Sequence, residues 1–237
     1  MQSGQGTLCW LIGTDFPAQG LIVNLCMDDR KRGGDMLQRL ACGLAFLLLS
    51  PGSVLADAFQ QSLVQSALER TAHQVTYNGA YYRLDYPNGD VPANIGVCTD
   101  VVIRSYRAVG VDLQVLVHED MAAHFSAYPS RRIWGLTSTD RNIDHRRVPN
   151  LQTFFSRHGE SLPVSDNPAD YAPGDLVTWM LPGNLPHIGI VADTLSSSTG
   201  NPEIVHNIGA GPRLEDMLFD YRVTGHYRYQ PVVANPE

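Results

Sequence analysis

The stretch "NIGVCTDVVIRSYRAVG", residues 94–110, places Cys98 directly before a segment with the pattern of a helix. Apolar side chains recur at i, i+4 and i+7 from Val102 to Val109, which is the spacing of one helix face, and Gly110 is a typical helix stop. The first backbone N–H groups of a helix have no partner within it and favour a negative charge beside them. Cys98 is therefore predicted to have a lowered thiol pKa.

Helices are predicted on both sides of this stretch, and strands are predicted in the C-terminal part of the chain. Helical spacing extends over residues 59–73 and 112–127, and Asn150 can cap a further short helix. From residue 173 the pattern changes to short β-rich runs separated by turns: "GDLVTWML", "HIGIVAD", "EIVHNI" and "RVTGHYRY". Helices followed by a meander of strands predict an α+β protein, with an antiparallel sheet packed on helices.

The segment "MLQRLACGLAFLLLSPGSVLADAF", from residue 36, has the layout of a secretory signal peptide. Arg39 precedes the apolar run Leu40–Leu49, and small residues stand at the predicted cleavage site before Asp57. The apolar run is too short to span a membrane, which takes about 20 residues. The predicted organisation is a leader at 1–35, a signal peptide at 36–56 and a single domain at 57–237. For the leader, a start codon placed too early is favoured over a functional extension.

The cysteines limit the redox chemistry of the predicted exported domain. Three of the four, Cys9, Cys26 and Cys42, lie before the predicted cleavage site, so the domain would retain only Cys98. That count excludes a disulfide framework. An unpaired thiol in an oxidising compartment is either buried and inert or functional.

The chain is acidic, with 24 Asp and Glu against 17 Lys and Arg and a net charge of −7 at pH 7. This balance argues against nucleic acid as the main partner. One domain of this length can bury a full hydrophobic core, and we expect a monomer.

Two histidines in the strand region are candidates to assist a cysteine nucleophile, which needs a base and a group that orients the base. His187 opens "HIGIVAD", and His206 lies in "EIVHNI". Facing residues of antiparallel strands approach within about 5 Å, so both imidazoles are expected beside the start of the helix at Cys98. The same three side chains could hold zinc together with a water, and the sequence leaves that option open.

Four motifs occur in one order: "GVCTD" at 96–100, "PGDLVTW" at 173–179, "HIGIV" at 187–191 and "EIVHN" at 203–207. Together they resemble the NlpC-like cell-wall peptidases, a circularly permuted branch of the papain-type cysteine hydrolases. The resemblance covers residues 82–229 and is strongest to secreted bacterial proteins catalogued only as a domain of unknown function. It implies a permuted papain-like fold with the nucleophile at a helix start.

The resemblance implies a role for each matching polar residue. Cys98 would attack an amide carbonyl, His187 would take the thiol proton and return it to the leaving amine, and His206 would orient His187. Asn207 is the alternative third residue, because a slip of one residue in the strand exchanges the faces of the two side chains.

The residues around the nucleophile depart in part from the family pattern. Thr99 stands where the family usually has serine, and Val97 replaces an acidic residue, for which Asp100 is a possible substitute. Tyr86, twelve residues before Cys98, matches a family tyrosine that helps the Cys98 backbone N–H to hold the oxyanion. The alternative for Tyr86 is one more loop aromatic.

A cationic segment interrupts the acidic chain between residues 131 and 147. Arginine binds carboxylates in a bidentate manner, and peptidoglycan stem peptides carry several carboxylates. The predicted substrate-binding residues are Arg131, Arg132, Arg146 and Arg147. A solvated or internally paired loop is the alternative.

These features predict a periplasmic or secreted cysteine amidase or peptidase that cleaves amide bonds in peptidoglycan stem peptides and uses no cofactor. The altered residue before Cys98 leaves a second class open, a papain-like module that binds wall or partner peptides without cutting them.

Overall fold

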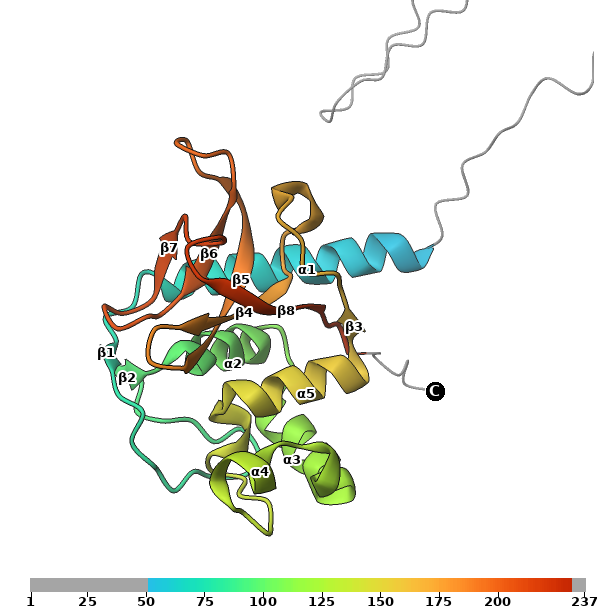
Figure 1. Ribbon diagram of the computed structural model, residues 1–237, viewed down its shortest axis with the longest axis vertical. Coiled ribbons are helices and arrows are strands. Elements are labelled where there is room, and N and C mark those ends of the chain that lie inside the picture. The colour runs from blue at the N-terminus through green and yellow to red at the C-terminus, as the bar shows by residue number, and fades with distance from the viewer. Residues whose placement is uncertain (1–50, 232–237) are drawn as a thin grey trace, which may run out of the picture. The chain divides into compact units, whose positions relative to one another are not determined.

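The computed structural model describes residues 51–231 of the chain (Figure 1). The predicted leader at 1–35 and most of the predicted signal peptide at 36–56 lie outside these residues. Helix α1 begins at Pro51, so the predicted cleavage site before Asp57 falls within its first turns. Among the described residues, no helix is both long enough and apolar enough to cross a membrane.

Helices occupy the first part of the described chain. The helical elements are α1 (Pro51–Arg70), α2 (Cys98–Ala108), α3 (Leu113–His124), η2 (Phe125–Ala127), α4 (Ser130–Trp134), η3 (Asp144–Arg146), α5 (Val148–His158) and η4 (Pro168–Asp170). Asp112 caps α3 by accepting hydrogen bonds from the backbone of Gln114 and Val115. The predicted helices therefore exist, and α4 is an additional short one. Asn150 does not cap α5 as predicted, because α5 begins at Val148 with Arg147 at its N-cap.

Strands follow the helices, and this order confirms the α+β class. The strands are β1 (Thr76–Tyr77), β2 (Ile95–Gly96), β3 (Glu160–Ser161), β4 (Leu176–Leu181), β5 (Leu185–Leu195), β6 (Pro202–His206), β7 (Arg213–Glu215) and β8 (Arg222–Arg228). The last six form one antiparallel sheet in the order β3-β8-β4-β5-β6-β7. Strands β1 and β2 have two residues each and pair in parallel, and both precede α2 in the chain.

Strand β5 lies inside the sheet and contributes side chains to both of its faces. Ile188 and Ile190 belong to the core shared with α1, α2 and α5, which lie on one side of the sheet (Figure 1). Val191 belongs to a second core on the opposite face, with Trp179 and Ile204. This alternation follows from the two-residue period of a strand, and it explains why "HIGIVA" is nearly continuous in apolar residues.

The register of β5 places the predicted histidines at one end of the sheet. His187 pairs with Trp179 of β4, and regular pairing with β6 begins at Ile190 and Val205. His187 and His206 therefore lie just beyond the last regular β5–β6 pair, and both are buried.

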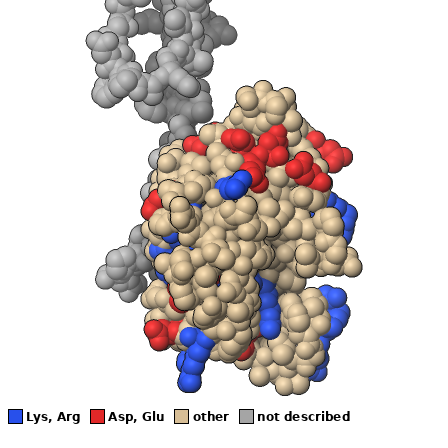
Figure 2. All heavy atoms as spheres, turned by 90° about the vertical axis from the view of Figure 1, so that its left-hand side faces the viewer, with Lys and Arg blue, Asp and Glu red and all other residues tan. Residues whose placement is uncertain are grey.

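Charge is distributed unevenly over the face of the domain shown in Figure 2. Acidic side chains gather in the upper part of this view, at the end where β6 and β7 lie, and basic side chains lie mainly lower down, towards the helices (Figures 1 and 2). The chain thus has locally cationic surface regions in spite of its net negative charge.

Candidate active site

Cys98 is the first residue of α2 and lies against the sheet. The carboxylate of Asp100 accepts a hydrogen bond of 2.7 Å from the Val97 N–H, which fixes the turn into the helix. Thr99 is buried, and its Oγ1 donates to the carbonyl of Arg146 at 3.1 Å. The two residues after the cysteine therefore hold the helix start in place.

A buried ion pair locks this helix start to η3. The Nε and Nη2 of Arg146 donate to the two carboxylate oxygens of Asp100 at 2.8 and 2.9 Å. The side chains are only 2% and 3% exposed, and Arg146 also donates to the carbonyl of Ala80. This pairing corrects the prediction that Arg146 binds substrate, because its guanidinium is enclosed and occupied. Since Asp100 is engaged in the same pair, it supports the site from behind the nucleophile.

The Cys98 sulfur is surrounded by hydrogen-bond donors but is almost closed to solvent, at 4% exposure. Backbone N–H groups of Ile188, Thr99 and Cys98 itself donate towards it, and the side chain of Tyr77 is hydrogen-bonded to it. Burial raises the pKa of the thiol to about 11, because the loss of hydration outweighs these backbone donors. The predicted lowering of the Cys98 thiol pKa is therefore wrong for this structure, in which the thiol is closed to solvent.

Tyr77, and not Tyr86, is the tyrosine at the nucleophile. Burial, followed by the charges of Cys98 and Asp100, raises the pKa of Tyr77 to about 12, although its ring remains 44% exposed. Tyr86 instead packs edge-on against His118 at 5.4 Å, and the guanidinium of Arg141 lies 5.4 Å from its ring centre. The alternative of a loop aromatic describes Tyr86 correctly.

His187 and His206 lie side by side and form a chain with Glu215. Nε2 of His187 lies 3.0 Å from Nδ1 of His206, and Nε2 of His206 lies 3.1 Å from a carboxylate oxygen of Glu215. Burial, and then the neighbouring His206, lowers the pKa of His187 to about 3. The pKa of His206 is also lowered by burial, an effect that Glu215 opposes. Both imidazoles are therefore neutral near pH 7.

The sulfur meets β5 at the peptide that joins His187 to Ile188. Side chains alternate along the strand, so Ile188 faces the helices while His187 shares the face of Trp179, with ring centres 5.9 Å apart. Because the Ile188 N–H donates to Sγ, one peptide unit separates the thiol from the backbone of His187. Among the described residues the side chains of Cys98 and His187 form no hydrogen bond with each other, and the nearest partner of His187 is His206.

The structure brings His206, and not Asn207, to His187. Oδ1 of Asn207 accepts a hydrogen bond of 3.0 Å from the Gly209 N–H, and its Nδ2 is directed to a cavity beside α2. The register of β6 thus distinguishes the two alternatives for the third position.

The other predicted arginines lie away from the cysteine. Arg131 and Arg132 border a surface cavity between α4, α5 and β8 that shares no lining residue with the surroundings of Cys98. The Arg147 guanidinium lies 4.3 Å from the ring centre of Trp134 and donates to Asp144 at 3.1 Å. The four arginines therefore do not form one substrate-binding cluster around the nucleophile.

Two residues of the site were not predicted from the sequence. Tyr77 belongs to a two-residue strand that gives no periodic signal, and Glu215 lies in the three-residue strand β7. No strand was predicted over residues 213–215, so Glu215 could not be placed beside His206 from the sequence. Among residues 51–231, no group of three or more His, Cys, Asp or Glu side chains is arranged to hold a metal ion.

The fold and the site define an α+β protein in which a helix-borne cysteine lies against the strand of an antiparallel sheet that carries one member of a buried histidine pair. The chain belongs to the family described as "Domain of unknown function (DUF1287)", whose model matches residues 64–229. This match confirms the resemblance to a family known only as a domain of unknown function.

The chain is also similar to individual proteins. The chain is 52% identical over 168 residues to "Uncharacterized protein YijF" of Escherichia coli (strain K12), a match covering 71% of this chain and 80% of that protein. Among solved structures, it is similar to NlpC1 and NlpC2 of Trichomonas vaginalis, at 14% and 15% identity and TM-scores of 0.38 and 0.37. Those matches cover 72% and 71% of this chain but only 44% and 47% of the two Trichomonas chains.

Proposed function

We propose that this chain is a cysteine amidase or peptidase that acts, after export, on amide bonds of peptidoglycan stem peptides. The observation that supports it best is the hydrogen bond from the Ile188 N–H to the Cys98 sulfur, which joins the thiol to the strand position next to His187. An inert buried cysteine would need neither a hydrogen bond from the Ile188 N–H nor a buried histidine pair that begins at the adjacent strand residue, His187.

One set of tautomers suits the three-residue chain His187–His206–Glu215. If Nδ1 of His187 receives the thiol proton, Nε2–H of His187 donates to Nδ1 of His206, and Nε2–H of His206 donates to Glu215. This arrangement keeps both rings neutral before the reaction and sets the orientation of His187. Once His187 is protonated, the dipole of His206 and the charge of Glu215 stabilise the imidazolium.

The resting pair is a neutral thiol and a neutral imidazole. With the thiol pKa at about 11 and the His187 pKa at about 3, a preformed thiolate–imidazolium pair is disfavoured before substrate binds. Proton transfer therefore accompanies the attack of sulfur on the carbonyl carbon. The imidazolium then returns the proton to the leaving amine, and water hydrolyses the thioester with His187 as base.

The oxyanion of the tetrahedral intermediate needs donors close to Cys98. The Cys98 backbone N–H at the start of α2 is one, and the Tyr77 hydroxyl is the other. The exposed ring of Tyr77 can move off the sulfur when a substrate carbonyl enters, and its hydroxyl then turns from the thiol to the oxyanion.

The proposed substrate rests on the sequence resemblance to NlpC-like cell-wall peptidases and on the predicted signal peptide. Purified sacculi incubated with the mature protein should release peptide fragments, identified by mass spectrometry, and a Cys98→Ser protein should release none. Recovery of intact protein beginning at Met1 from the cell envelope would contradict the predicted cleavage before Asp57.

A non-catalytic module that binds wall peptides is the second candidate, and the near-complete burial of the thiol favours it. The same experiment separates the two, because a binding module sediments with sacculi and leaves their peptides intact.

A further inference from the structure

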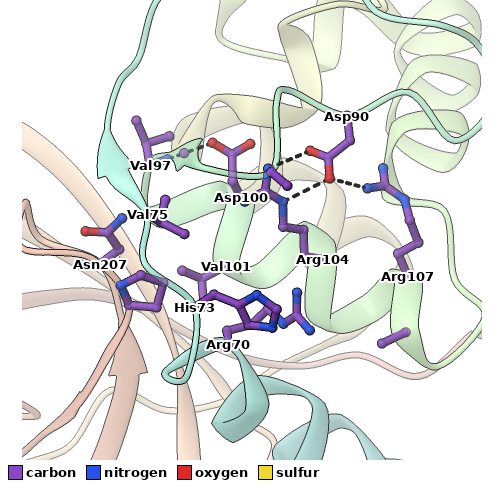
Figure 3. A pocket seen from close by; sticks show the side chains of 14 residues that line it. Arg70, His73, Val75, Asp90, Val97, Asp100, Val101, Arg104, Arg107 and Asn207 are labelled. Carbon is purple, nitrogen blue, oxygen red and sulfur yellow. Dashed lines mark hydrogen bonds and ion pairs between the residues drawn. The ribbon is translucent and has the colours of Figure 1, made fainter.

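A cavity of about 310 Å³ lies along α2, on the side where the C-terminal end of α1 approaches it. Its walls come from α1, from the segment before β2, from α2 and from the loop after β6 (Figure 3). Figure 3 shows Asn207 on one side of it and Arg70, Arg104 and Arg107 on the other. Neither Cys98 nor His187 lines this cavity, although Val97, the residue before the cysteine, does.

The cavity wall carries an excess of positive charge. Arg104 and Arg107 share the single carboxylate of Asp90, at 2.9 and 3.1 Å. Asp100 also borders the cavity, but its charge is balanced by the buried Arg146. Arg70 meets only Glu69, its neighbour in the chain, through an Nη2 contact of 3.0 Å. Among the residues that line the cavity, three arginines therefore stand against two carboxylates.

Three buried donors in this wall have no acceptor. They are Nε of Arg70, Nε of Arg107 and Nδ2 of Asn207, and they make up half of the six buried side-chain nitrogen and oxygen atoms without a partner in the described residues. Asn207 is only 1% exposed, and its Oδ1 is already held by the Gly209 N–H, so Nδ2 is the atom turned to the cavity. Unpaired buried donors are costly, and a negatively charged acceptor that enters the cavity would satisfy those within its reach.

Gly96 keeps the cavity open next to the helix start. A methyl group at this position would lie 3.3 Å from Oδ2 of Asp100 and 3.4 Å from Nη1 of Arg104, in space that now belongs to the cavity. The bare backbone thus leaves Arg104 accessible to a ligand from this side.

We infer that this cavity binds the carboxylate of a small peptide-like ligand. A carboxylate has two acceptor oxygens and no donor, which matches a wall with three unpaired N–H donors and one surplus positive charge. The volume suits a single acylated amino-acid residue. The inference goes beyond the proposed hydrolase activity, because binding at this cavity needs no reaction at Cys98.

Titration calorimetry of the mature protein with N-acetylalanine tests the inference, with N-acetylalanine amide as the uncharged control. The carboxylate should bind at least about tenfold more tightly than the amide, as expected for hydrogen bonds to a charged group. Equal affinities, or tighter binding of inorganic phosphate than of N-acetylalanine, would overturn it.

Two substitutions place the ligand in the cavity. Arg70→Gln removes the surplus charge at a helix end where only a contact with Glu69 is lost, and Asn207→Leu removes the buried Nδ2 at similar volume. Each should weaken N-acetylalanine binding at least about tenfold. Arg132→Gln, at an exposed position of α4, is the matched control and should bind as the wild type does.

The readout keeps this inference distinct from the proposed function. Wild-type affinity in a folded Arg70→Gln protein would overturn the carboxylate site even if sacculi are digested normally. Conversely, specific binding without any digestion would support the carboxylate site and count against the hydrolase.

Discussion

The backbone N–H of Ile188 donates a hydrogen bond to the sulfur of Cys98, so the thiol is fixed by the strand that carries His187. The contact uses backbone atoms of β5 and therefore does not depend on the side chain at position 188. It sets the position of the thiol relative to the sheet, one peptide unit from His187.

Cys98→Ser is expected to fold and to lose at least about 10³-fold in hydrolysis of a stem-peptide substrate, because serine gives up its proton far less readily to His187. A purely structural cysteine predicts instead a loss of about 1 to 3 kcal/mol in the free energy of unfolding from the buried hydroxyl. Melting temperature and hydrolysis rate, measured side by side, separate these outcomes. A serine variant with wild-type activity excludes the proposed nucleophile.

His187→Ala should abolish turnover and leave the fold intact, because the thiol loses its proton acceptor. Glu215→Gln keeps the shape of the outer residue and removes the charge behind His206, so its loss should be smaller. Rates for both variants at pH 7 provide the measurement. The proposed proton chain fails if the Glu215 variant is the more damaged of the two, or if His187→Ala remains active.

Tyr77→Phe removes the hydroxyl that contacts the thiol and should lower kcat by about 10²- to 10³-fold, the usual effect of losing one oxyanion donor. Tyr86→Phe is the matched control, since the ring contact of Tyr86 with His118 does not involve its hydroxyl. Steady-state kinetics on both proteins decide the matter. If instead Tyr86→Phe lowers kcat and Tyr77→Phe does not, the oxyanion donor is Tyr86, as predicted from the sequence.

Alkylation of Cys98 should be slower than alkylation of a free thiol between pH 6 and pH 9, because burial raises its pKa to about 11 and excludes the reagent. The rate constant with iodoacetamide, compared with that of a free cysteine peptide, gives the measurement. In denaturant the difference should vanish. Fast labelling at pH 6 would instead reveal a preformed thiolate.

Stability should decrease in acid because of the buried neutral histidines. Burial lowers the pKa of His145 and of His187 to about 3, whereas both return to about 6.5 in the unfolded chain. Unfolding then takes up protons below pH 6.5, so the free energy of unfolding falls as the pH drops from about 6.5 towards 3, by up to about 1.4 kcal/mol per pH unit for each histidine.

His145→Asn isolates one part of this pH dependence. The variant should show a slope smaller by about one proton in urea unfolding between pH 6.5 and pH 4. His145 lies in η3, outside the proposed proton chain, so hydrolysis is not needed as a readout. An unchanged slope would show that His145 is not held neutral by burial.

Much of the fold was predictable, because its signals are local. The helical period after Cys98 and the apolar runs around His187 and His206 depend on neighbours in the chain, and the structure has a helix and two strands there. The contact between His187 and His206 follows from the antiparallel pairing of the two strands that carry them. Only the register of β6 shows that His206, and not Asn207, faces His187.

The rest of the site depends on contacts that sequence patterns do not encode. Tyr77 reaches the thiol through a pairing of only two residues, which leaves no periodic signal. Arg146 pairs with Asp100, which lies 46 residues away in the sequence. Its positive charge was therefore interpreted as a substrate-binding group, although its partner lies within the protein. The thiol pKa depends on packing, where the burial of Cys98 outweighs the donors of the helix start.

The ion pair between Asp100 and Arg146 and the contact between Cys98 and Ile188 both join segments that lie far apart in the chain. The surroundings of the thiol therefore form only when these segments come together. Ordering segments so far apart in the chain costs loop-closure entropy that only the completed fold repays. A partly folded chain thus carries an ordinary exposed thiol, without the helix start and the strand that surround Cys98 in the fold. If the proposed function is correct, hydrolysis begins only with the finished tertiary structure.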